Sequence, residues 1–133
     1  AFLWAQLEEA ESITARYLKL WDIYHEAFEL LEQSGHLRRP IVPSDCKQQG
    51  HMYYLLLKNI KDRTLFIEYM EHKGINCVFH YVPLHSSLAG KKYGRINGNM
   101  EVTNGVSNRL VRLPLWLGMD QAKVIEEVIT YFS

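Results

Sequence analysis

The chain has 133 residues, of which 47% are hydrophobic, and its formal net charge is zero with histidine neutral. This length suits one compact domain. The balanced charge argues against a protein that binds nucleic acids or anionic membranes, because such a protein needs a basic surface. Its two cysteines, Cys46 and Cys77, imply no disulfide framework, so we expect a reducing compartment, the cytoplasm. The sequence shows no apolar run of about 20 residues and no basic leader, and it starts at Ala1 without a methionine. We therefore expect a piece of a longer cytoplasmic protein.

Residues 1–34 are predicted to form one long amphipathic helix that stops at Gly35. Its apolar stripe recurs at helical spacing and consists of Tyr17, Leu20, Trp21, Tyr24, Phe28 and Leu31. Globular helices usually run for about 8–20 residues, so part of this one is expected to pack on something outside the chain. The isolated chain is expected to self-associate through the apolar residues Phe2, Leu3, Trp4 and Leu7.

A strand, a helix and a second strand are predicted next. Residues 40–50 read as a proline-containing connector, and His51–Lys58, short and rich in aromatic and aliphatic side chains, as a buried strand. Asp62 is predicted to cap a helix that runs through Lys73 and ends at a glycine. Its inward side chains are expected to be Leu65, Phe66, Tyr69 and Met70. Ile75–Val82 is predicted as the second strand.

The last part of the chain is predicted to contain a loop, a strand and a helix. Residues 86–105 are rich in glycine and asparagine and read as a long loop, followed by a helical turn at Val106–Leu110. Val111–Leu115 contains a proline and is predicted as an edge strand or a strand end. Asp120 is predicted to cap a last helix with Val124, Ile125, Val128, Ile129 and Phe132 inward. The element order predicts a single α/β domain over residues 1–133, a two-layer α/β sandwich with helices on one face of the sheet.

Polar side chains gather where the second strand leaves the sheet. Cys77, His80 and His85, with His72 nearby, resemble a metal-ligand set, but strand alternation puts Cys77 and His80 on opposite faces, so we expect no metal there. Cys77 is predicted to be a small buried hydrophobe, since no partner for a nucleophile can be named. His80, Tyr81 and His85 are either satisfied by backbone and water or line a pocket for a polar ligand.

Two further cationic features have alternative interpretations. Lys91-Lys92-Tyr93-Gly94-Arg95 is either a solvated loop or a phosphate contact, and no GxxxxGKS/T or GxGxxG motif supports a nucleotide site. Arg112 is a single charge in an apolar run, which is costly to bury unpaired. It either extends to solvent from an edge strand or lies beside a carboxylate or a phosphate-bearing ligand.

Several segments, taken in order, resemble one known family. They are His80-Tyr81-Val82-Pro83-Leu84-His85-Ser86-Ser87, Ala89-Gly90-Lys91-Lys92-Tyr93-Gly94, and Ser107 followed by Arg109-Leu110-Val111-Arg112-Leu113-Pro114-Leu115. Together with Ala5-Gln6-Leu7-Glu8 and His51-Met52-Tyr53-Tyr54, they resemble the C-terminal part of the sugar-nucleotide aminotransferases that depend on pyridoxal 5'-phosphate (PLP), the DegT/DnrJ/EryC/StrS family. The resemblance covers essentially the whole chain.

The resemblance implies a fold and a function. The fold would be the small C-terminal domain of the aspartate aminotransferase-like, fold type I architecture. The activity would be amino transfer, with glutamate as the donor, to a dTDP-4-keto-6-deoxyhexose during synthesis of lipopolysaccharide or another surface polysaccharide, by a homodimer. By resemblance, His80, Tyr81 and His85 would line one wall of the nucleotide-sugar site, with Tyr93 close by.

The family's PLP-binding residues have no counterpart in this sequence. They lie in a large domain that would precede Ala1, and no lysine here stands in the family's aldimine motif. We therefore expect this chain alone to hold no cofactor, to contain no catalytic residue and to be inactive. The alternative is a stand-alone, non-catalytic module that binds a ligand or a partner. Leu88 stands where the family has proline, Asn108 where it has glutamate, and residues 118–123 are about one helical turn short.

Overall fold

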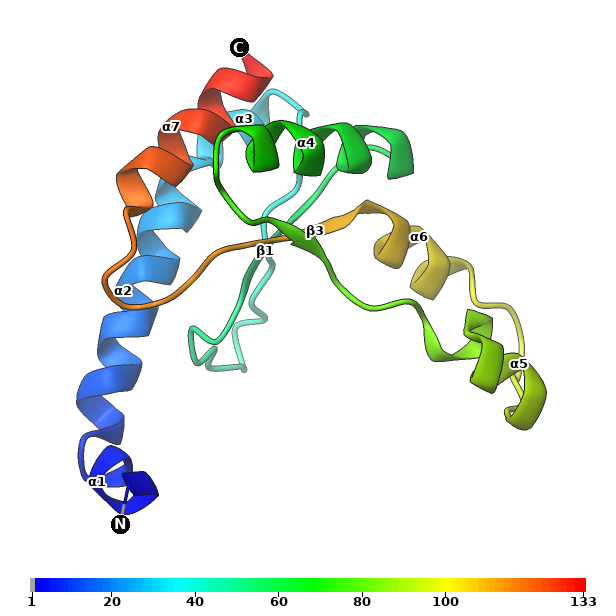
Figure 1. The fold of residues 1–133 in the computed structure, drawn as a ribbon, viewed down its shortest axis with the longest axis horizontal. Coiled ribbons are helices and arrows are strands. Elements are labelled where there is room, and N and C mark those ends of the chain that lie inside the picture. The colour runs from blue at the N-terminus through cyan, green and yellow to red at the C-terminus, as the bar shows by residue number, and fades with distance from the viewer. Residues whose placement is uncertain (1) are drawn as a thin grey trace.

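The computed structural model describes residues 2–133 and has the predicted two-layer α/β architecture (Figure 1). A small sheet lies at the centre, and helices cover one of its faces. Ala1, where the predicted first helix begins, lies outside the described residues. In the described part the elements are α1 (Phe2–Glu8), α2 (Ala10–Ala27), α3 (Glu29–Gln33), β1 (Tyr53–Leu56), α4 (Ile60–His72), β2 (Val78–Phe79), the 3-10 helix η1 (Leu84–Ser86), α5 (Leu88–Tyr93), α6 (Glu101–Arg109), β3 (Leu110–Leu113) and α7 (Gln121–Phe132).

The sheet is antiparallel, in the order β1-β3-β2. Tyr53 lies opposite Leu113, and Leu55 lies opposite Val111, so these four side chains share one face. All four are buried. This face provides the sheet's half of the hydrophobic core.

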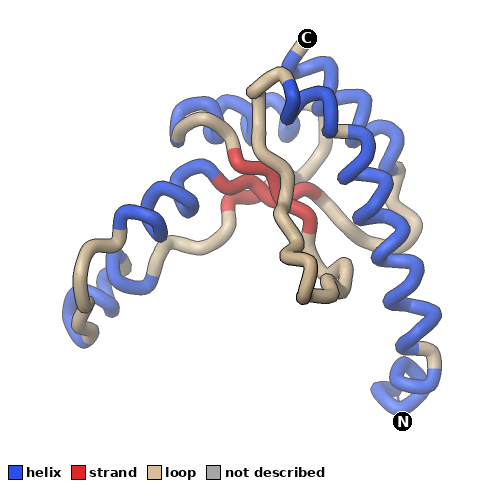
Figure 2. Tube along the Cα trace, turned by 180° about the vertical axis from the view of Figure 1, so that it is seen from behind, coloured by secondary structure: helices blue, strands red, loops and turns tan. Residues whose placement is uncertain are grey.

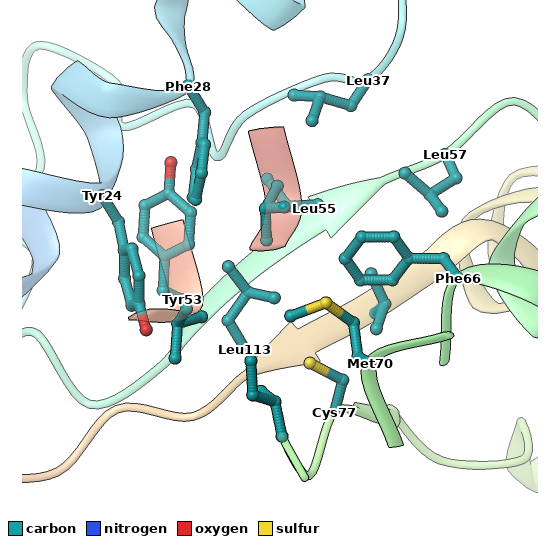
Figure 3. Packing of buried hydrophobic residues seen from close by; sticks show 14 of the residues in the cluster. Tyr24, Phe28, Leu37, Tyr53, Leu55, Leu57, Phe66, Met70, Cys77 and Leu113 are labelled. Carbon is teal, nitrogen blue, oxygen red and sulfur yellow. The ribbon is translucent and has the colours of Figure 1, made fainter. Parts of the chain in front are cut away.

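The helices α2, α4 and α7 provide the other half of the core. Figure 3 shows Tyr24, Phe66 and Met70 of this layer close to the strand residues of the core. The buried side chains from this layer are Trp21, Tyr24, Phe28, Phe66, Met70, Val124 and Val128. Two hydrogen bonds fix α2 against its neighbours: the Tyr24 hydroxyl donates to the Pro114 carbonyl at 2.9 Å, and the Gln121 amide donates to the Leu20 carbonyl at 2.6 Å. The Tyr24 hydroxyl and the Gln121 amide are thus satisfied by backbone carbonyl groups.

The predicted long helix is present but is interrupted twice, at Glu9 and at Phe28. Backbone hydrogen bonds continue across both points, for example from Ile13 N to Glu9 O and from Glu32 N to Phe28 O. Gly35 has a φ of 72° and ends the helical run, as predicted. No helix among residues 2–133 is both long and apolar enough to cross a membrane.

The cap of α4 differs from the prediction. Asn59, rather than Asp62, is the N-cap: its side-chain oxygen accepts a hydrogen bond from the Asp62 amide at 2.9 Å. Asp62 returns a contact, because its carboxylate accepts from the Asn59 side chain at 3.0 Å. The pair is a reciprocal cap one turn earlier than the sequence suggested, and α4 begins at Ile60. Leu65, predicted to face inward, is 46% exposed.

The glycine-rich segment is helical and not a long loop. Residues 86–105 contain α5 and most of α6, and both helices extend from the sheet on the side opposite to α1 (Figure 2). The sequence signal is weak because α5 has only six residues and α6 includes a glycine, two valines and a threonine. Contacts with η1 for α5, and with α4 and β1 for α6, supply what propensity lacks.

The strands also differ in position and length from the prediction. Of the two alternatives for Val111–Leu115, the edge strand is wrong, because β3 is central. The strand end is confirmed, because Pro114 lies just beyond β3, where no ladder hydrogen bond is required. β2 has only two residues, opposite Val111 and Arg112. The chain after it turns into η1 and leaves the sheet, so the predicted strand at Ile75–Val82 is mostly irregular. In α7, Asp120 is the cap as predicted, whereas Ile129 is 40% exposed.

Candidate functional site

The chain that follows β2 is held in a tight unit made of η1 and α5. The Ser87 side chain caps α5 by accepting from the Gly90 amide at 2.9 Å. A Cβ placed on Gly90 would lie 1.6 Å from the carbonyl oxygen of Leu84, so only glycine fits at this contact. Serine and glycine at these positions therefore fix how α5 returns onto the segment that carries His85.

Helix α6 runs beside this segment and is anchored from α4. The Arg63 guanidinium donates to the Ser107 carbonyl at 3.1 Å, near the C-terminal end of α6. A cation there also interacts favourably with the helix dipole. The same guanidinium lies 5.3 Å from the centroid of the Phe79 ring in β2. Arg63 thus connects α4, α6 and β2 at the place where the chain leaves the sheet.

Two hollows lie between α6 and the segment after β2. The first, of about 420 Å³, is lined by His80, Tyr81, Val82, Pro83, Leu84, Val102, Thr103, Val106, Ser107 and Leu110. The second, of about 300 Å³, is lined by Leu84, His85, Gly90, Gly94, Arg95, Ile96, Met100 and Thr103. Leu84 and Thr103 line both, so the hollows adjoin. Together they offer apolar walls with a few polar groups, the usual composition of a ligand site.

Three of the four predicted site residues lie in these hollows. His80 and Tyr81 line the first, with their rings in an edge-to-face arrangement and centroids 4.7 Å apart. His85 lines the second, and its Nε2 lies 3.0 Å from Oδ1 of Asn104. Tyr93 lines neither hollow: it is 78% exposed, with the Lys92 ammonium 5.0 Å from its ring centroid. The structure therefore brings three of the predicted residues together and leaves Tyr93 apart.

Sequence reasoning missed the contribution of α6. Thr103, Asn104 and Ser107 all meet the segment of residues 80–85, and Ser107 Oγ donates to the Tyr81 carbonyl at 3.2 Å. These residues were predicted to lie in a loop or a helical turn, so their common helical face was not visible. In the sequence, only the family resemblance marks Ser107.

Cys77 and His80 occupy different environments, as predicted, although both lie just outside the two-residue strand β2 and strand alternation is not the reason. Cys77 is 4% exposed and belongs to the core, whereas His80 is exposed. Burial raises the pKa of the Cys77 thiol to about 12. Among residues 2–133, no group of three His, Cys, Asp or Glu side chains is placed to hold a metal ion.

We expect one thiol of the native chain to react quickly with an aromatic disulfide reagent, and the second only after unfolding. Cys46 is exposed, while Cys77 is buried and protonated. Absorbance of the released reagent counts the thiols, and Cys46→Ser should remove the fast phase. A fast phase that survives this change would contradict the burial of Cys77.

The stability of the folded chain should also decline as the pH rises from 9.0 towards about 12, because the Cys77 thiol of the unfolded chain loses its proton first.

The two cationic features have different surroundings. Arg112 lies on β3 between Tyr54 and Val78, on the sheet face opposite to the helix layer, and is partly buried. Its strand is central, so it does not extend to solvent from an edge. Lys91 and Lys92 lie in the last turn of α5, where cations are favourable, and Arg95 lines the second hollow.

Comparisons with known proteins agree with this architecture. The family model of the DegT/DnrJ/EryC1/StrS aminotransferases matches residues 1–132. Among solved structures, DesV of S. venezuelae, in complex with a ketimine intermediate, has a TM-score of 0.85 and 22% identity over 98% of this chain. The aminotransferase TlmJ of Streptoalloteichus hindustanus has a TM-score of 0.80, 20% identity and 96% coverage. PseC of Helicobacter pylori, an aminotransferase involved in the biosynthesis of pseudoaminic acid, has a TM-score of 0.79 and 16% identity over 96% of this chain.

The match covers only part of each of these structures. This chain spans 34% of DesV, 34% of TlmJ and 35% of PseC. At identities this low, the structural similarity shows the fold alone. It confirms the predicted α/β small domain of fold type I aminotransferases. The family itself is shown by the family model, which extends over nearly the whole chain. The chain belongs to the DegT/DnrJ/EryC1/StrS aminotransferase family.

Proposed function

We propose that this chain is the C-terminal small domain of a PLP-dependent aminotransferase that moves an amino group from glutamate to a dTDP-4-keto-6-deoxyhexose. The specific likeness proposed is to dTDP-4-amino-4,6-dideoxygalactose transaminase, which serves surface-glycan synthesis. The family membership and the quoted HYVPLH and RLVRLPL segments support this proposal. The observation that carries it is the meeting of His80, Tyr81 and His85 at two adjoining hollows.

The composition of the hollows suits one wall of a nucleotide-sugar site. The first hollow is mainly apolar, so it offers a surface against which a deoxysugar ring can pack, while His80 and Tyr81 offer polar groups at its edge. Arg95, which lines the second hollow, carries the positive charge that a diphosphate requires. In this proposal the chain binds and orients the sugar nucleotide.

The described residues do not fit the covalent attachment of PLP. That attachment needs a lysine amine facing the site, and no lysine lines either hollow. Lys73 pairs with Glu127 at 3.0 Å, and hydrogen bonds to Glu127 and Tyr69 raise its pKa, so it remains an ammonium. We therefore assign no step of amino transfer to this chain. The related structures are about three times as long as this chain. We propose that the cofactor is held by a corresponding segment of a longer cytoplasmic homodimer.

The exposed residues of α1 agree with such a larger assembly. Phe2 is 82% exposed, Trp4 68% and Leu7 60%, and α1 has no buried residue. A helix with this much exposed apolar surface is typical of an interface. We propose that this face contacts the remainder of the enzyme.

The proposal predicts that His85→Ala raises KM for the sugar nucleotide about threefold to tenfold in the longer enzyme, the cost of one hydrogen bond. The PLP absorbance should not change, because the cofactor lies elsewhere. His72→Ala is the matched control, since His72 is exposed on α4, outside both hollows. Steady-state kinetics of amino-sugar formation measures both variants. Equal KM values for His85→Ala and the unchanged enzyme would contradict the assigned wall.

The second candidate is a non-catalytic module that binds a sugar nucleotide by itself. Calorimetric titration of the purified chain with a dTDP-sugar separates the candidates. Tight binding without PLP favours the module, whereas binding weaker than about 1 mM favours a domain that needs its second wall.

A further inference from the structure

Two polar side chains of α6 contact the proposed sugar-nucleotide wall, one turn apart. Asn104 lies against the ring of His85, with Oδ1 3.0 Å from Nε2, and Ser107 Oγ donates to the Tyr81 carbonyl at 3.2 Å. Residues three apart on a helix share a face. Thr103, which lines both hollows, lies beside them on the same helix. One helix face thus contacts both ends of the segment from Tyr81 to His85.

The contact with Asn104 determines which nitrogen of His85 a ligand can use. An amide oxygen only accepts hydrogen bonds, so Nε2 of His85 must carry the proton in this contact. In the neutral ring, Nδ1 is then an acceptor without a proton. His85 lines the second hollow, so in the neutral ring the nitrogen left for a ligand is one that accepts. A hydroxyl or amino group of a ligand suits this nitrogen, whereas a carbonyl or phosphate oxygen does not.

Helix α6 is held in place by contacts of its own, so it can position the segment of residues 80–85. Arg63 donates to the Ser107 carbonyl at 3.1 Å, and α6 contacts both α4 and β1. The segment of residues 80–85, by contrast, forms no strand ladder beyond Phe79. Its position therefore depends on contacts such as those from Asn104 and Ser107.

We propose that Asn104 and Ser107 are positioning residues for the sugar-nucleotide wall, and that Asn104 holds His85 so that Nδ1 accepts a hydrogen bond from a hydroxyl of the sugar. This inference rests on the proposed function for the identity of the ligand. Its structural part, the fixed orientation of the His85 ring, stands on the chain alone.

The structural part is tested on the purified chain without ligand, by NMR. Three-bond couplings of His85 report its χ1 rotamer, and ring ¹⁵N shifts report its tautomer. We expect one rotamer with the proton on Nε2 in the unchanged chain, averaged couplings in Asn104→Ala, and recovery in Asn104→Asp, which keeps the accepting oxygen. Asn108→Ala is the matched control, because Asn108 is an exposed asparagine on the same helix. Averaged couplings in the unchanged chain, or couplings unaffected by Asn104→Ala, would overturn the inference.

The functional part is tested in the longer enzyme with the dTDP-4-keto-6-deoxyhexose. Asn104→Ala and Ser107→Ala should each raise KM about threefold to tenfold, with kcat nearly unchanged and with rescue in Asn104→Asp. Equal losses in Asn108→Ala, or a lowered kcat at constant KM, would overturn the positioning role. A failure of the proposed function appears differently: the enzyme then aminates no sugar nucleotide, while the His85 couplings still respond to Asn104.

Discussion

Phe66→Ala is expected to lower the free energy of unfolding by about 3–5 kcal/mol, the usual cost of removing a fully buried aromatic ring. Phe66 is 0% exposed and joins α4 to α7 within the core. Its ring lies edge-to-face with Tyr131, at a centroid distance of 5.1 Å, and is stacked with Phe132 at 5.9 Å. Alanine would leave a cavity between α4 and α7 and would remove both aromatic contacts.

Leu65→Ala is the matched control for this change. Leu65 is the preceding residue of the same helix and is 46% exposed, so we expect a loss of about 1 kcal/mol or less. Urea unfolding followed by circular dichroism measures both variants. Equal losses at the two positions would show that α4 does not pack as described.

Gly90→Ala is expected to displace α5 from η1 and to cost about 1–3 kcal/mol, the range for inserting atoms into an occupied space. The added Cβ would lie 1.6 Å from the carbonyl oxygen of Leu84, which is backbone and cannot rotate away. The amides of Lys91 and Gly94, which donate to Ser87 O and Gly90 O at 2.9 Å each, should lose protection from hydrogen exchange. The second hollow, which Gly90 and His85 line, should open with them.

Gly105→Ala, on the neighbouring helix α6, is expected to have the opposite effect on stability. No atom lies within 4 Å of a Cβ placed on Gly105, which is within α6, so alanine should stabilise by about 0.5–1 kcal/mol. Denaturant unfolding and amide exchange compare the two variants. A neutral Gly90→Ala with unchanged exchange would refute the close contact between α5 and η1.

The parts of the fold that the sequence predicted are those where an apolar pattern coincides with the core. Trp21, Tyr24 and Phe28 recur at helical spacing and are buried, and Val124 and Val128 do the same in α7. Burial of such a stripe provides most of the free energy that holds a helix in place, so pattern and structure agree there.

The parts that the sequence did not predict are held by contacts distant along the chain. α6 has weak intrinsic propensity and depends on Arg63, which is 44 residues from Ser107. β3 is central because β2 pairs with it, an arrangement that no local pattern contains. Asn59 replaces Asp62 as the cap because both residue types suit that role and the backbone decides between them.

The sequence predicts only those residues of the candidate site that lie in the segment after β2. His80, Tyr81 and His85 were marked by a polar cluster at the end of a predicted strand and by the family resemblance, and they lie at the two hollows. Asn104 and Ser107 became visible only when α6 put them on one face beside that segment. Tyr93 was selected from the resemblance, yet in this chain its ring faces solvent beside Lys92.

We propose that this chain supplies a wall for the sugar nucleotide but not the lysine that binds PLP. Titrating the purified chain with PLP, reducing with borohydride and mapping the label by mass spectrometry tests it directly. We expect weak, substoichiometric labelling spread over exposed lysines, because no described lysine lines the two hollows. Stoichiometric labelling of one lysine, with a stable imine absorbance before reduction, would contradict the account.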